Sequence, residues 1–101
     1  MQEQKPAEGG QQVKIKIREE DLKGNYSNLM QIVHTKEEFV LDFFLLSPPE
    51  GILASRIIMS PGHTKRMIKA LKDNIEKYEA KFGKIEEASV PDEKIGFKME
   101  K

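Results

Sequence analysis

The residues of this chain that could do chemistry gather in one short segment, Ser60-Pro61-Gly62-His63-Thr64-Lys65-Arg66. A helix start presents free backbone N–H groups, which can bind a phosphate when cations lie beside them. The helix dipole disfavours cations at this end, so a plain cap with solvated side chains is the alternative that we favour. The candidate anion or nucleic-acid contacts here are Ser60, His63, Lys65, Arg66, Lys69 and Lys72.

Other sources of chemistry are scarce. The chain has no cysteine, which excludes disulfides, thiolate catalysis and cysteine-based metal sites. The two histidines, His34 and His63, do not stand in a metal-binding spacing such as H-E-x-x-H. No G-x-S-x-G, Walker or dinucleotide-binding motif is present in the sequence. We therefore expect a protein without catalytic residues, metal or cofactor.

Composition limits the partners. The 101 residues suit one domain, and equal numbers of basic and acidic residues, 17 each, give no global field toward nucleic acid or a membrane. The first twelve residues, MQEQKPAEGGQQ, lack the apolar region of a signal peptide. The apolar runs are shorter than the ~20 residues of a membrane helix. We expect a cytoplasmic protein without membrane contact.

The chain divides into a disordered tail at residues 1–11, one domain at 12–84 and a flexible tail at 85–101. Strict alternation over Val13–Arg18 predicts a first, half-exposed edge strand. Asp21–Asn25 is expected to form a turn. Apolar and β-forming runs predict three more strands at Tyr26–His34, Phe39–Leu46 and Ile52–Met59, the last two separated by the breaker Ser47-Pro48-Pro49-Glu50-Gly51.

Ser60 and Pro61 begin the best-defined element, an amphipathic helix that ends at Gly83. Its apolar stripe consists of Ile68, Leu71, Ile75, Tyr78 and Phe82, spaced three and four residues apart. The predicted fold is α+β, with an antiparallel four-stranded sheet in β-β-β-β-α order that one long C-terminal helix covers on one face.

The hairpins predict which side chains share a face of the sheet. If His34 closes against Phe39 in the first hairpin, Ile32 lies opposite Leu41 and Met30 opposite Phe43. In the second hairpin, a loop symmetric about Pro49 sets Asp42 opposite Arg56, and it sets Phe44 and Leu46 opposite Ala54 and Ile52. The richer face, which the helix should cover, contains Met30, Ile32, Phe39, Leu41, Phe43, Leu45, Leu53, Ile57 and Met59.

The opposite face is too apolar for water, and the chain has no second helix to cover it. We therefore predict a homodimer or a dimer of dimers. The alternative is that the C-terminal tail folds back over this face. The predicted interface residues are Leu29, Val33, Val40, Asp42, Phe44, Leu46, Ile52, Ala54, Arg56 and Ile58. Asp42 and Arg56 form either a buried pair that fixes register or a semi-exposed pair that contributes little.

Four stretches carry a family resemblance: the pair Tyr26/Asn28, Phe39-x-Leu41-Asp42-Phe43, Arg56-Ile57-Ile58-Met59-Ser60-Pro61-x-His63 and Asn74-Ile75-x-x-Tyr78-Glu79-x-x-Phe82-Gly83. Together they span about residues 24–85, and they resemble the bacterial and archaeal family catalogued as domain of unknown function 3467. The resemblance implies no activity, catalytic residue or cofactor.

These observations favour a non-enzymatic, homo-oligomeric accessory or scaffold protein that binds another macromolecule. One alternative is a factor that binds nucleic acid, because Lys65, Lys69 and Lys72 share a side of the helix. The family resemblance extends this alternative to an RNA polymerase-associated factor, because it implies bacterial members encoded near RNA polymerase subunits. A second is chaperone-type binding of unfolded chains, by analogy with SecB-type export chaperones at the level of fold.

Overall fold

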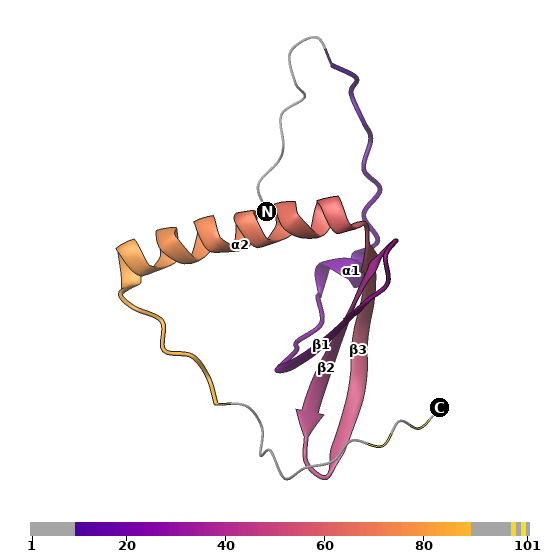
Figure 1. The fold of residues 1–101 in the computed structure, drawn as a ribbon, viewed down its shortest axis with the longest axis vertical. Coiled ribbons are helices and arrows are strands. Elements are labelled where there is room, and N and C mark those ends of the chain that lie inside the picture. The colour runs from indigo at the N-terminus through magenta and orange to yellow at the C-terminus, as the bar shows by residue number, and fades with distance from the viewer. Residues whose placement is uncertain (1–9, 90–97, 99, 101) are drawn as a thin grey trace.

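The computed structural model describes residues 10–89, 98 and 100 (Figure 1). The order of elements is α1 (Glu19–Leu22), β1 (Leu29–His34), β2 (Phe39–Ser47), β3 (Glu50–Met59) and α2 (Pro61–Phe82). The predicted α+β class, with an antiparallel sheet and a C-terminal helix, is confirmed. Most of the two predicted tails, residues 1–9 and 90–97, lies outside the described residues.

Over the described residues the sheet has three strands in the order β1-β2-β3, so the prediction of four strands is wrong. The missing strand is the alternating segment Val13–Arg18, which has no regular structure. A strand needs a neighbour for its backbone hydrogen bonds. This segment has no neighbouring strand among residues 10–89, and Val13 and Ile15 are 74% and 75% exposed.

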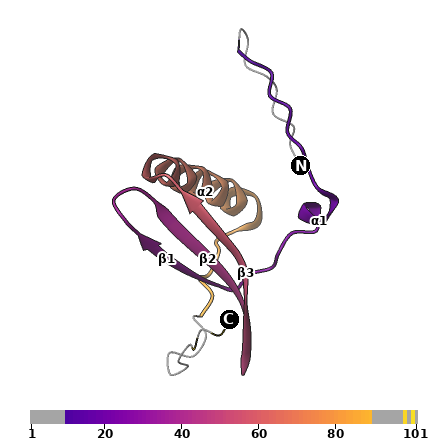
Figure 2. The same cartoon turned by 90° about the vertical axis from the view of Figure 1, so that its right-hand side faces the viewer.

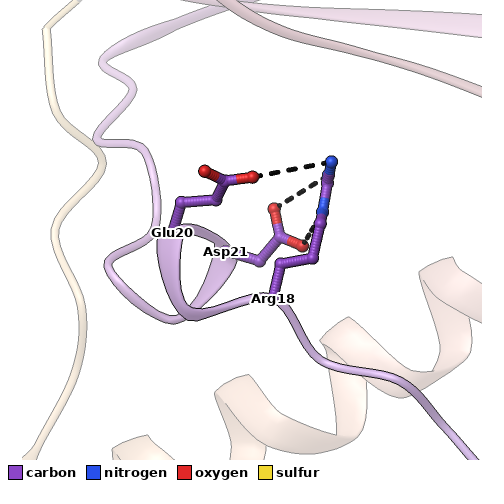
Figure 3. Close-up of polar contacts among 3 residues, drawn as sticks. All are labelled: Arg18, Glu20 and Asp21. Carbon is purple, nitrogen blue, oxygen red and sulfur yellow. Dashed lines mark hydrogen bonds and ion pairs between the residues drawn. The ribbon is translucent and has the colours of Figure 1, made fainter.

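Arg18 binds locally instead of continuing a strand. Its Nε and Nη2 atoms donate to the two carboxylate oxygens of Asp21 at 2.9 and 3.2 Å, and Nη1 lies 3.6 Å from a carboxylate oxygen of Glu20 (Figure 3). Acidic side chains in a first helical turn are favoured by the dipole, which explains why the short helix α1 begins at Glu19. The sequence reading, which expected only a turn from Asp21, missed this helix.

The register of β1 on β2 is as predicted, with His34 opposite Phe39 and Ile32 opposite Leu41. The register of β2 on β3 agrees with the prediction only in part. Asp42 lies opposite Arg56, but the turn is centred between Pro48 and Pro49, so Ser47 pairs with Glu50. Phe44 therefore faces Leu53, and Leu46 faces Gly51. A bulge between Phe43 and Phe44 absorbs the extra residue of β3 and restores the predicted pairing beyond it.

Helix α2 begins and ends where the sequence predicts. The Ser60 side chain accepts a hydrogen bond from the backbone N–H of His63 at 3.2 Å, and Pro61 occupies the first turn. At the other end, Gly83 adopts a φ of 97°, a conformation that favours glycine, and its N–H donates to the Glu79 carbonyl at 3.0 Å.

The expectation that α2 covers one face of the sheet is wrong for a single chain. The helix leaves the end of β3 and extends away from the sheet, as two perpendicular views show (Figures 1 and 2). Burial on α2 is largely confined to its first two turns, at Pro61, Thr64 and Met67. The stripe residues beyond them are 47–66% exposed: Ile68, Leu71, Ile75, Tyr78 and Phe82.

The cause is the junction between β3 and α2, which consists of Ser60 alone. The Ser60 carbonyl accepts hydrogen bonds from the backbone N–H and the hydroxyl of Thr64, at 3.0 and 2.9 Å. Thr64 is buried, so these bonds lie where the helix meets the sheet. Ser60 is extended, with φ −67° and ψ 154°, and after this single residue the later turns of α2 run away from the sheet (Figures 1 and 2).

Candidate oligomer interface

The face of the sheet that carries Asp42 is the predicted interface, and the observed register defines its members. Side chains directly opposite each other on paired strands share a face. The Asp42 face therefore contains Leu29, Gln31, Val33, Val40, Asp42, Phe44, Leu46, Leu53, Arg56 and Ile58.

Three residues change place relative to the sequence prediction. Leu53 pairs with Phe44 and joins the Asp42 face, whereas Ile52 pairs with Leu45 on the other face. Ala54 sits at the bulge without a partner in the register. The shift follows from the two-residue turn, since moving a strand by one residue turns every side chain to the opposite face.

The Asp42 face is apolar but uncovered. Val33, Leu53 and Ile58 are 61%, 50% and 55% exposed, and Leu29, Val40, Phe44 and Leu46 are half-buried. A monomeric protein rarely exposes a continuous apolar patch beyond a few hundred Å², and larger patches mark interaction surfaces. The face therefore has the character of an interface on both composition and exposure.

Asp42 and Arg56 form a two-point ion pair in the middle of this face. Arg56 donates through Nε to Asp42 Oδ1 at 2.6 Å and through Nη2 to Oδ2 at 2.9 Å. The Asp42 side chain is 13% exposed and that of Arg56 is 57% exposed. The hydrogen bonds from Arg56, together with its charge, hold the pKa of the Asp42 carboxyl below its ordinary value.

The second face of the sheet, which we call the Leu41 face, is covered only in part. Leu41 is 2% exposed, and Phe39 and Met59 near the start of α2 are half-buried. On the Asp42 face at the same end, Val33 and Ile58 are exposed. This difference places the first two turns of α2 over the Leu41 face. The rest of that face is open, with exposures of 44–61% at Met30, Ile32, Ile52 and Ile57.

The chain consequently has almost no core. Among the described residues, Leu41 and Thr64 are the buried ones. Full burial of one large aliphatic side chain contributes roughly 1.5–3 kcal/mol. Two sheet faces and one helix stripe remain half-exposed in the single chain. The free energy of burial that these side chains do not gain is comparable with the roughly 5–15 kcal/mol by which folded domains are stable.

The candidate anion contacts lie on the first turns of α2, but they do not converge on one point. Arg66 Nη2 donates to His63 Nδ1 at 2.9 Å, so both side chains engage each other. Lys65 and Lys69 are exposed. Lys72 borders the apolar stripe, where it lines a shallow, open hollow together with Ile68, Leu71 and Ile75. His34, the other histidine, stacks on the ring of Phe39.

Sequence reasoning missed the polar residues that secure the start of β1. The Asn28 side chain donates to the Leu46 carbonyl and accepts from the Leu46 N–H, both at 2.8 Å. The Ser27 hydroxyl lies within hydrogen-bond distance of the Phe44 and Leu29 carbonyls, at 2.9 and 3.0 Å. Asn28 thus pairs with β2 as a further residue of β1 would. A local signal existed only for the contact of Ser27 with the Leu29 carbonyl, because Ser tends to bind backbone groups near it in sequence. The bonds to Phe44 and Leu46 join residues 17 and 18 positions apart, which no local pattern indicates.

The described residues contain neither a membrane-spanning helix nor a metal-binding cluster. No helix in this part of the chain is both long and apolar enough to cross a membrane. Within the same residues, no three histidine or acidic side chains lie close enough together to hold a metal ion.

The three-stranded antiparallel sheet followed by one long helix defines a small α+β domain whose distinguishing feature is uncovered apolar surface. A family model described as "Protein of unknown function (DUF3467)" matches residues 1–87, and the chain belongs to this family. Neither a curated protein nor a solved structure matches the chain significantly. The family carries no assigned activity, so function has to be argued from the surfaces themselves.

Proposed function

We propose that this protein is a non-enzymatic, homo-oligomeric accessory or scaffold protein, and that the assembled oligomer binds another macromolecule. The observation that carries the proposal is the exposed apolar surface of the single chain, on both faces of the sheet and along α2. A second copy of the chain supplies a surface of the same kind, and closed symmetric assemblies are the commonest way in which soluble proteins cover such surfaces.

The Asp42 face is the proposed contact between sheets. Two copies related by a twofold axis present the same residues to each other, so an apolar face matches itself. Within one chain, Arg56 donates a hydrogen bond to each of the two carboxylate oxygens of Asp42. Such a pair can enter an interface without leaving a charge unpaired, and it fixes the register of the contact.

Light scattering coupled to size-exclusion chromatography tests the proposal. We expect a dimer or a tetramer at micromolar concentration. The variant Ile58→Asp places a charge on the Asp42 face and is expected to lower the mass of the species. Asp73→Asn is the matched control, because Asp73 is exposed on the side of α2 opposite the stripe. A monomer for the unaltered protein would refute the proposal.

Binding of RNA or DNA is the alternative function, and it can be tested directly on the same protein. Contacts to phosphates produce binding that weakens steeply with salt. Under the scaffold proposal, RNA and DNA binding at physiological salt stays weak, and replacing Lys65, Lys69 and Lys72 by Glu leaves the oligomer intact. Salt-dependent binding that this triple variant abolishes would instead support the nucleic-acid function.

A further inference from the structure

We propose that α2 is exchanged between copies, so that the stripe of one protomer covers the open part of the Leu41 face of a second copy. This inference rests on the proposed homo-oligomer and names the element that joins its subunits. It differs from the contact between Asp42 faces, which α2 does not reach.

Helix α2 extends away from its own sheet (Figures 1 and 2). Ser60 is the whole connection between β3 and α2, and three hydrogen bonds from His63 and Thr64 fix it. Cover of the Leu41 face by its own helix ends after the first two turns. The later turns therefore need a surface that the same chain does not bring to them.

The two uncovered surfaces match in size. The exposed stripe of α2 runs from Ile68 to Phe82, which is 15 residues, and at 1.5 Å per residue it is about 22 Å long. The open part of the Leu41 face on β3 runs from Ile52 to Ile57, which is 6 residues, and at about 3.3 Å per residue it is about 20 Å long. The stripe of one copy can thus lie along the open part of the sheet of a second copy.

The exposed stripe of α2 offers apolar area for an interface. A standard interface buries roughly 800 Å² on each partner. Tyr78 and Phe82 are 50% and 66% exposed, and their ring centroids lie 5.0 Å apart with the ring planes tilted by 49°. An aromatic side chain buries about 150–250 Å², so these two supply roughly 170–290 Å² of the required area. Ile68, Leu71 and Ile75 contribute further from the same stripe.

The proposed exchange is reciprocal. Each chain has one uncovered stripe and one partly covered Leu41 face, with Met30, Ile32 and Ile57 exposed on it. Two copies therefore satisfy each other, and no apolar stripe remains unpaired. Exchange of an identical element between protomers is a general route to dimers.

Disulfide trapping tests the exchange, and the absence of cysteine from the chain makes it clean, because introduced thiols are the only ones. One full-length chain carries Ile75→Cys on the stripe, and a second carries Ile57→Cys on the Leu41 face. The two are unfolded together, refolded and oxidised. We expect a covalent heterodimer of the two variants as the main product. The control pairs Asp73→Cys, on the opposite side of α2, with Ile57→Cys and is expected to give little of it.

Each other outcome is decisive. Predominant Ile75→Cys homodimers would show that stripes pack on each other, which overturns the exchange but leaves the oligomer standing. A third chain carries both substitutions. If it forms a disulfide within one chain and no covalent dimer forms, α2 folds back onto its own sheet, and this result also overturns the exchange. A monomer by light scattering for the unaltered protein overturns the exchange and the proposed function together.

Discussion

Asp42 carries its charge on a sheet face made mainly of apolar side chains, and its geometry makes a prediction about pH. Its native pKa lies below the ordinary value of 3.8, first because of the hydrogen bonds from Arg56. A carboxyl with a depressed native pKa contributes stability that is fully present above the ordinary pKa. That stability is lost as the pH falls through the native pKa.

Replacing Asp42 by Asn removes this titration and keeps the shape of the side chain. We expect Asp42→Asn to be less stable than the unaltered protein at neutral pH, with a difference that shrinks as the pH falls below about 4. Chemical denaturation followed by circular dichroism at several pH values measures it. Glu86→Gln, at an exposed position beyond α2, is the control. A difference between the Asp42 variant and the unaltered protein that stays constant down to pH 2 would contradict the assignment.

Asn28 gives a second prediction at the scale of one residue. Its side chain donates to the Leu46 carbonyl and accepts from the Leu46 N–H. Each hydrogen bond contributes about 0.5–1.5 kcal/mol, so Asn28→Ala is expected to lower the free energy of unfolding by roughly 1–3 kcal/mol. Asn28→Asp keeps the acceptor but loses the donor when ionised. Its loss of stability should therefore be pH-dependent, and an unchanged stability for both variants would exclude the role.

At the scale of elements, α2 was predictable because its signals are local. The cap at Ser60, the stop at Gly83 and the spacing of the stripe all lie within the helix itself. The segment Val13–Arg18 shows the opposite case. Its alternation is typical of a strand, yet a strand also needs a neighbour, and alternation says nothing about whether the chain provides one.

The register and the placement of α2 show what local patterns cannot specify. Asp42 was correctly set opposite Arg56, but the sequence does not reveal that the turn is centred between Pro48 and Pro49 or that a bulge follows. Four of the nine β2–β3 pairs, those of residues 44–47, were consequently displaced, and Ile52 and Leu53 exchanged faces. Similarly, the amphipathic stripe indicates that α2 must be covered, but the direction of the helix follows from the backbone angles of the single junction residue, Ser60, which the stripe does not specify.

Ser60 gives the prediction that belongs to this scale. Its side chain caps α2, and loss of such a cap costs about 0.5–2 kcal/mol. We therefore expect Ser60→Ala to lower the free energy of unfolding by that amount, while Ser60→Thr or Ser60→Asp retains most of it. Denaturant titration at fixed protein concentration measures the series. Equal stability of the Ala, Thr and Asp variants would show that the cap does not hold the junction.

At the scale of the whole molecule, the small core makes a prediction that requires no substitution. If subunits are needed to cover the apolar faces, folding and association are one reaction, and the stability of the protein depends on its concentration. A tenfold rise in concentration is worth about 1.4 kcal/mol per association step. For a dimer with about 80 ordered residues in each chain, this corresponds to a rise in Tm of roughly 3–6 °C.

Thermal unfolding followed by circular dichroism between about 1 and 100 μM, a range of about two tenfold rises in protein concentration, measures this shift in Tm. The variant Ile58→Asp, which disturbs one interface, should lower the Tm at every protein concentration. A Tm that stays constant over this range would mean that one chain is stable by itself, and then the exposed sheet faces and the stripe of α2 would need a different explanation.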